Sequence, residues 1–168
     1  LCRRAGEGAR LVRSGGWSGW APTQFLGMHV TGKTVGIVGM GRIGKAIARR
    51  CHQGFEMSIV YYNRSQVTDP HVPGMQFERL ADLLQVADIV VLAVPATPET
   101  RHLIGADELR ALGPHGYLIN IARGDVVDEA ALVAALKSGA IAGAGLDVYE
   151  REPELAAGLA DCENAVLL

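Results

Sequence analysis

The sequence predicts an α/β fold of the Rossmann type, in which a doubly wound parallel sheet carries helices on both faces. Three neighbouring features support this prediction: a β-type apolar run at 34–38, a glycine-rich turn, and a helical pattern at 42–52. A second β-type run at 57–62 follows where the next strand of a βαβ unit should lie. This order of strand, turn, helix and strand is typical of a parallel sheet.

The turn has the pattern G-x-G-x-x-G, formed by Gly39, Gly41 and Gly44. Glycines at this spacing allow a tight turn, a close approach of the backbone to a pyrophosphate, and close packing of the helix on the sheet. The free N–H groups and the positive dipole end of the helix N-terminus also favour a phosphate group. Because a strand precedes the motif and a helix follows it, we expect these glycines to bind a dinucleotide.

The rest of the chain continues the alternation of strands and helices. We expect strands near 75–77 and at 88–93, 117–120 and 141–148, and helices at 78–85 and 128–138, the last stopped by Gly139. Pro95 ends the apolar run at 88–93, and Thr97–Thr100 resembles a helix start. The stretch 63–74 is rich in turn residues. Near the N-terminal end, 14–21 is expected to be a loop anchored by its two tryptophans.

Composition narrows the function classes. The 168 residues are 49% hydrophobic and 20% charged, which suffices for one core. The net charge is −2, with 16 basic and 18 acidic residues interspersed, so the chain lacks the basic field that nucleic acid or an anionic membrane requires. No apolar run reaches membrane-spanning length, and three distant cysteines predict neither a disulfide framework nor a metal site. We expect small-molecule partners and a cytoplasmic location.

The two chain ends predict a part of a longer protein. The chain begins at Leu1 within a helical pattern and stops at Leu168 within a strand-like run. We expect a helix and arm at 1–30, followed by a dinucleotide-binding domain at 31–168 that is truncated at its C-terminus. The first segment is more apolar than a free terminus should be, which predicts a contact between two copies of the chain, most simply a homodimer.

The end of the second predicted strand indicates which cofactor is preferred. Asn63, Arg64 and Ser65 stand about where an acid would bond the adenosine 2′-hydroxyl of NAD. An acid there would repel a 2′-phosphate, whereas Arg64 offers a forked cationic donor and Ser65 a neutral one. We expect these three residues to bind the cofactor with NADP(H) preferred and NAD(H) possible. The alternative is a solvated loop arginine without a ligand.

Four motifs in order carry a resemblance to a known family. They are G-M-G-R-I-G at 39–44, V-P-A-T-P-E-T at 94–100, N-I-A-R-G-D-V-V-D at 120–128 and G-L-D-V-Y-E-R-E-P at 145–153. Together they resemble the D-isomer-specific 2-hydroxyacid dehydrogenases, and within that family the glyoxylate/hydroxypyruvate reductases. The resemblance covers nearly the whole chain. It implies an enzyme that transfers hydride between a nicotinamide cofactor and a small 2-keto or 2-hydroxy acid.

The resemblance also implies roles for single residues. Arg123 matches the arginine that binds the keto acid and polarises its carbonyl. Glu152 matches the acid that pairs with the catalytic histidine and keeps it protonated. Asp147 matches the aspartate that holds the nicotinamide carboxamide. Further cofactor positions are Pro95 and Thr100 beside the cofactor, and Arg42 and Ile43 over the pyrophosphate. Outside these motifs, Arg123 would be interpreted as a structural ion pair, and Glu152 and Asp147 as helix-start and turn residues.

Two features depart from the family pattern. Ala93 stands where histidine, asparagine or isoleucine is expected, and the family's proton-donating histidine would lie after Leu168. The histidines of this chain, His29, His52, His71, His102 and His115, all precede that place. Two other functions therefore stay open: an NAD-dependent relative acting on phosphoglycerate, phosphite or formate, and a non-catalytic dinucleotide-sensing module like the corepressors of the family.

Overall fold

The computed structural model describes residues 1–69 and 74–168, in which seven parallel strands form one sheet with the order β3-β2-β1-β4-β5-β6-β7. The strands are β1 Thr34–Val38, β2 Ser58–Tyr62, β3 Met75–Phe77, β4 Ile89–Leu92, β5 Tyr117–Asn120, β6 Gly143–Leu146 and β7 Ala165–Leu167. The predicted fold class is confirmed, because the order runs outward in both directions from the neighbours β1 and β4. Two halves of the sheet are thus wound in opposite directions.

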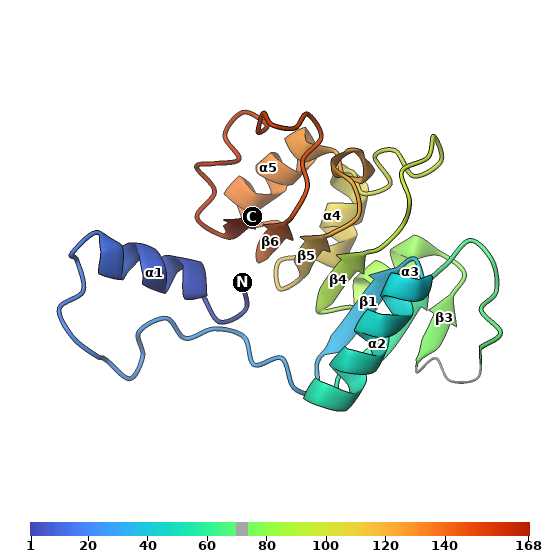
Figure 1. The fold of residues 1–168 in the computed structure, drawn as a ribbon, viewed down its shortest axis with the longest axis horizontal. Coiled ribbons are helices and arrows are strands. Elements are labelled where there is room, and N and C mark those ends of the chain that lie inside the picture. The colour runs from blue at the N-terminus through green and yellow to red at the C-terminus, as the bar shows by residue number, and fades with distance from the viewer. Residues whose placement is uncertain (70–73) are drawn as a thin grey trace.

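Helices cover both faces of the sheet (Figure 1). They are α1 Ala5–Arg13, α2 Arg42–Phe55, α3 Leu80–Val86, α4 Ala106–Leu112 and α5 Glu129–Ser138. On one face, buried leucines of α3, α4 and α5 pack against the sheet, among them Leu83, Leu109 and Leu132. On the other face, Ala48 of α2 joins Ile37 and Ile59. Strands between two such layers are buried on both sides, which explains the unbroken apolar run of β4.

The N-terminal segment touches the sheet only at its ends, where Leu1 lies beside Gly143 of β6 and Cys2 and Met28 pack against the core. Figure 1 shows α1 and the arm after it projecting from the rest of the chain, and α1 has no buried residue within the described chain. Trp17 is 54% exposed and Trp20 is 83% exposed. The prediction that the tryptophans anchor this loop is therefore wrong, because the segment runs outward and neither indole ring reaches the core.

Three other predictions change with the structure. Thr97–Thr100 forms a turn and no helix, because the Thr100 hydroxyl bonds to the turn's own backbone. The helix that follows is α4, which begins at Ala106 and which sequence reasoning missed. Part of the turn-rich stretch predicted at 63–74 lies outside the described residues, and so does His71. The other predicted helices and strands are confirmed to within a few residues at their ends.

Candidate cofactor and substrate site

The glycine-rich turn joins β1 to α2 at the point where the strand order reverses. Gly39 has φ +99°, a left-handed conformation that favours glycine, and a Cβ there would lie 2.6 Å from the carbonyl oxygen of Ala93. A Cβ on Gly44 would overlap the carbonyl oxygen of Gly39, so α2 packs directly on the turn. Both glycines are therefore required by close approach within the protein itself.

Gly41 differs from its two neighbours in the motif. It is the N-cap of α2 with φ −77°, and a Cβ built on it meets no atom within 4 Å. Nothing inside the protein demands glycine at this position, yet its open side borders the pocket described next. The free space beside the α2 N-terminus is what a bound pyrophosphate requires, so the turn fits a dinucleotide.

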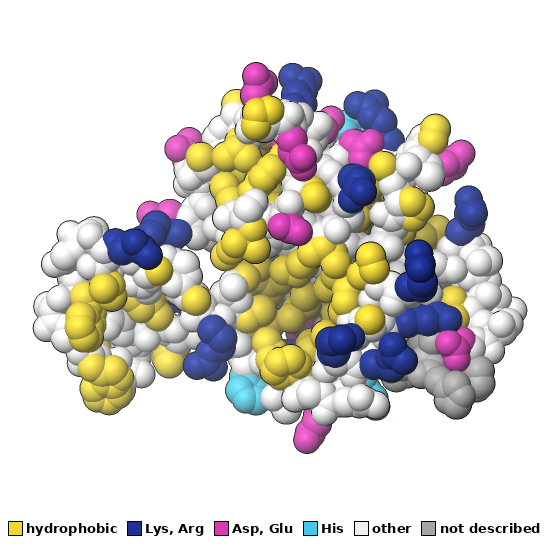
Figure 2. Space-filling view, in the orientation of Figure 1, with side chains coloured by type: hydrophobic (Ala, Val, Ile, Leu, Met, Phe, Trp, Pro, Cys, Tyr) yellow, Lys and Arg dark blue, Asp and Glu magenta, His cyan; other side chains and the backbone are white. Residues whose placement is uncertain are grey.

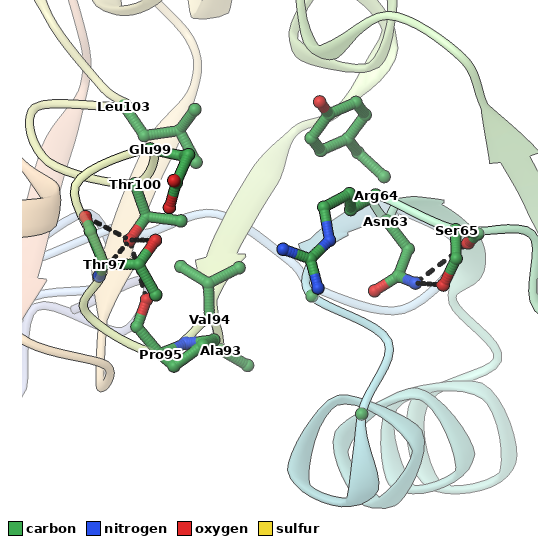
Figure 3. A pocket seen from close by; sticks show the side chains of 13 residues that line it. Asn63, Arg64, Ser65, Ala93, Val94, Pro95, Thr97, Glu99, Thr100 and Leu103 are labelled. Atoms are coloured by element: carbon green, nitrogen blue, oxygen red, sulfur yellow. Dashed lines mark hydrogen bonds between the residues drawn. The ribbon is translucent and has the colours of Figure 1, made fainter.

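A pocket of about 340 Å³ opens between the carboxyl ends of β1, β2 and β4. Its walls are the glycine turn, the residues after β2 and the loop after β4: Gly39, Gly41, Tyr62, Asn63, Arg64, Ser65, Ala93, Val94, Pro95, Thr97, Glu99, Thr100 and Leu103. Figure 3 shows Arg64 reaching across this space toward the loop that carries Thr97 and Glu99. Seven of the residues predicted to bind the cofactor therefore line one pocket: Gly39, Gly41, Asn63, Arg64, Ser65, Pro95 and Thr100.

Asn63 shapes the pocket wall through local hydrogen bonds. Its Oδ1 accepts a bond from the N–H of Met40 at 3.2 Å, and its Nδ2 donates to the carbonyl oxygen of Ser65 at 2.9 Å. The side chain therefore ties the loop after β2 to the glycine turn. Arg64, between Asn63 and Ser65 in the chain, points into the pocket (Figure 3).

The opposite wall is a turn stabilised by Thr100. Its hydroxyl donates to the carbonyl oxygen of Pro95 at 2.7 Å and accepts from the N–H of Thr97 at 2.8 Å. Glu99 in this turn accepts a hydrogen bond from Thr97 that lowers the pKa of its carboxyl, and the charge of Arg64 acts in the same sense. The wall therefore places a carboxylate on the far side of the pocket from Arg64, a feature that sequence reasoning missed.

Arg42 and Ile43 lie outside this pocket, on the first turn of α2. They border a neighbouring hollow that also includes Gly41 and Ala93, and both side chains are exposed. The two residues thus flank the glycine turn outside the pocket that Arg64 lines.

Arg123 follows β5 in a loop organised by a buried asparagine. The Asn120 side chain donates to the carbonyl oxygen of Arg123 at 2.9 Å and accepts from the N–H of Ala122 at 3.0 Å. Asn120 is 1% exposed, so these bonds replace the water that its amide gives up. Sequence reasoning quoted Asn120 only as part of a motif, although a polar residue ending a buried strand signals such a role.

The loops after β5 and β6 touch at their backbones. A Cβ on Gly124 would overlap the carbonyl group of Tyr149, so the residue after Arg123 must be glycine. Glu152 lies in the second loop, where its Oε1 accepts from the N–H of Tyr149 at 3.0 Å, and it precedes Pro153 through a cis peptide bond. Asp147 begins that loop, and its N–H bonds to the carbonyl oxygen of Asn120 at 3.1 Å. Arg123, Asp147 and Glu152 thus come from two adjoining loops on one edge of the sheet.

His102 contacts the second of these loops. Its Nε2 lies 2.9 Å from Oε1 of Glu150.

The described residues contain no group of three or more His, Cys, Asp or Glu placed to hold a metal ion. Within the same residues, no helix is long and apolar enough to cross a membrane.

Comparison with known proteins identifies the family. The model of the family described as "D-isomer specific 2-hydroxyacid dehydrogenase, NAD binding domain" matches residues 1–168. The chain is 51% identical to glyoxylate reductases of Thermococcus kodakarensis and Pyrococcus horikoshii, each over 170 residues that cover 98% of this chain and 51% of that protein.

Solved structures similar to this chain include two reductases. The NADPH-dependent glyoxylate/hydroxypyruvate reductase of Sinorhizobium meliloti is 41% identical with a TM-score of 0.88, and the match covers 99% of this chain and 52% of that one. A glyoxylate reductase from Paecilomyes thermophila is 40% identical with a TM-score of 0.88, covering 99% and 50%. The chain spans about half the length of the relatives it matches. It belongs to the D-isomer-specific 2-hydroxyacid dehydrogenase family, of which it is an NAD-binding domain.

Proposed function

We propose that the chain is the cofactor-binding domain of a reductase that transfers hydride from NADPH, in preference to NADH, to a small 2-keto acid such as glyoxylate or hydroxypyruvate. The observation that carries the proposal is the contact between the loops of Arg123 and Glu152 at the edge of the sheet where the cofactor pocket opens. In such sheets, ligands bind outside the carboxyl ends of the strands. The similarity to glyoxylate reductases favours this substrate class.

The pocket supports a role for each wall in holding the cofactor. The α2 N-terminus and the open side of Gly41 would receive the pyrophosphate. Arg64 and Ser65 would bind the 2′-phosphate, and among the described residues of their loop no acid lines this wall. A guanidinium can bond two phosphate oxygens at once, which NADH lacks at that position. The preference for NADPH follows from that difference.

The residues of the two adjoining loops are proposed to have different roles at the substrate and the nicotinamide. When bound, the nicotinamide supplies the hydride. Arg123 would bind the carboxylate of the keto acid and stabilise negative charge on its carbonyl oxygen. Glu152 would keep the family's histidine protonated, so that it can donate a proton to the forming alkoxide. Asp147, at the start of the same loop, would hold the carboxamide of the nicotinamide.

Steady-state kinetics of the full-length protein test this proposal. Wild type should oxidise NADPH when glyoxylate or hydroxypyruvate is added. Arg123→Ala should raise KM steeply and lower kcat, because the keto acid loses a bidentate partner and its carbonyl a polarising charge. Arg110→Ala, which removes an exposed arginine paired with Asp107 on α4, should leave both constants unchanged. Normal kinetics in Arg123→Ala, or no keto-acid reduction by wild type, would contradict the proposal.

We also propose that two copies associate through the helix and arm at 1–30, in a cytoplasmic enzyme. Large apolar side chains are exposed there, among them Val12, Trp20 and Leu26, and Figure 2 shows hydrophobic side chains on the arm and over the sheet on the same side of the molecule. The described cysteines are all free thiols, as a reducing compartment favours. Light scattering should give a dimer, and a monomer at high concentration would count against this association.

A further inference from the structure

The segment that carries Glu152 is attached to the core by a buried carboxylate. Glu129, the first residue of α5, is 4% exposed. Its Oε1 accepts a hydrogen bond from the N–H of Glu150 at 2.8 Å. Ala156, which follows Glu152 in the chain, lines the same cleft as Glu129. One side chain therefore holds the backbone two residues before Glu152.

Burying this carboxylate is expensive for the fold. Burial raises the pKa of Glu129, and the nearby charges of Glu150 and Glu152 raise it further. A buried carboxylate needs hydrogen-bond donors on its oxygens. It has acceptor oxygens and no donor, which suits it to hold a backbone N–H group of the loop.

A second attachment reaches the same loop from the cofactor pocket. The Glu150 carboxylate lies 2.9 Å from Nε2 of His102 and 3.7 Å from Nη2 of Arg101. Both residues belong to the turn after β4 whose neighbours Thr100 and Leu103 line the pocket. The His102 N–H donates to the carbonyl oxygen of Asp125 at 2.7 Å, in the loop of Arg123. The cofactor wall, the Arg123 loop and the Glu152 loop are thus joined through adjacent residues.

We propose that Glu129 is a positioning residue of the reductase, which holds the Glu152 carboxylate in place through the backbone of Glu150, and that His102 supports the same loop through the Glu150 side chain. This inference rests on the function proposed above. Glu129 touches neither substrate nor cofactor in this scheme. It acts by fixing the N–H of Glu150, and a carboxylate displaced by about 1 Å can cost on the order of 100-fold in rate.

Charged groups from two other segments, the loop after β6 and the turn after β4, surround this site, and the test must separate them from Glu129. The cleft beside Glu129 includes further charged residues of the loop, and the turn after β4 adds two more. In full they are Glu150, Arg151, Glu152, Glu154, Arg101 and His102. Any of them can change a pH profile through charge alone. A double-mutant cycle with Glu152 isolates the part that acts through Glu152.

The test is the pH dependence of kcat for full-length Glu129→Gln, Glu152→Gln and the double variant. The glutamine removes the negative charge and turns one acceptor oxygen into a donor, so the bond from the Glu150 N–H is weakened. We expect Glu129→Gln to lower kcat about 10- to 100-fold, with the KM for NADPH unchanged. Its pH profile should shift toward lower pH, as in Glu152→Gln, and the double variant should shift no further than Glu152→Gln.

Asp128→Ala is the matched control. Asp128 caps the same helix by accepting from the N–H of Ala131 at 3.0 Å, so its loss weakens α5 without freeing the Glu152 loop. That variant should melt earlier yet keep the wild-type pH profile. His102→Gln, at a partly exposed side chain, repeats the cycle if Glu129→Gln does not fold, and should shift the profile in the same direction.

The outcomes distinguish this inference from the proposed function. An unshifted profile in Glu129→Gln, or a shift that adds fully to that of Glu152→Gln, would overturn the positioning role while the proposed function stands. If Glu129→Gln does not fold, an unshifted or fully additive profile in His102→Gln overturns it equally. An unshifted Glu152→Gln would remove the role that Glu129 serves, and would overturn both.

Discussion

Gly41→Ala should weaken cofactor binding while leaving the fold intact. A Cβ at this position meets no protein atom within 4 Å, and its φ of −77° is open to alanine. Alanine is a poorer helix N-cap, which costs up to about 1 kcal/mol, and it reduces the entropy of the unfolded chain by a similar amount. The two effects offset each other. We expect the melting temperature to change by no more than about 3 °C.

The same methyl group stands where the pyrophosphate must approach the backbone. Loss of one charge-assisted hydrogen bond costs about 1.5–3 kcal/mol, which raises Kd about 10- to 150-fold. Gly44→Ala should behave in the opposite way. Its Cβ would overlap the carbonyl oxygen of Gly39, so the packing of α2 must shift at a cost of about 1–3 kcal/mol or more, with a clear fall in melting temperature.

Fluorescence titration with NADPH and thermal melts followed by circular dichroism measure both effects on the same samples. A Gly41→Ala chain that binds NADPH as tightly as wild type would refute the assignment of this turn to the pyrophosphate. A large loss of stability in Gly41→Ala would refute the geometric argument instead.

Two further predictions concern the same chain. Tested alone, its 168 residues should bind NADPH without reducing glyoxylate measurably, because every histidine precedes Glu152 and general acid catalysis is worth about 10²–10⁴-fold; steady NADPH oxidation would contradict this. Burial raises the pKa of Glu129, so its contribution to stability is present below its unfolded pKa of about 4.3 and is lost as the pH rises through the raised value. Urea unfolding should therefore show wild type losing stability relative to Glu129→Gln as the pH rises from about 3.5 to 7, whereas a constant difference would exclude this effect.

The sequence predicted the elements whose patterns are local. The strand at 34–38 and the glycine spacing identify the fold because Gly39 and Gly44 leave no room for a side chain within the protein. The N-x-A-R-G motif likewise located Arg123 at a strand end, where the structure has it.

What the sequence could not supply are contacts between segments distant in the chain. Glu129 appears as an ordinary first-turn acid, and only the fold shows it buried against the N–H of Glu150. The tryptophans look like anchors because indole rings are usually buried, but the direction in which the arm leaves the core decides their exposure. Helix α4 has only seven residues, with Leu109 and Leu112 as its buried contacts, too few for a clear helical period.

The pocket at the ends of β1, β2 and β4 is proposed to bind NADPH through Arg64. The most direct measurement is a fluorescence titration of the chain and of Arg64→Ala with NADPH and NADH, with Arg79→Ala as a control for loss of an exposed arginine. Wild type and Arg79→Ala should bind NADPH about 10- to 100-fold more tightly than NADH, and Arg64→Ala should lose most of that preference while binding NADH nearly as before. Equal affinities of wild type for the two cofactors, or a preference that survives in Arg64→Ala, would contradict the claim.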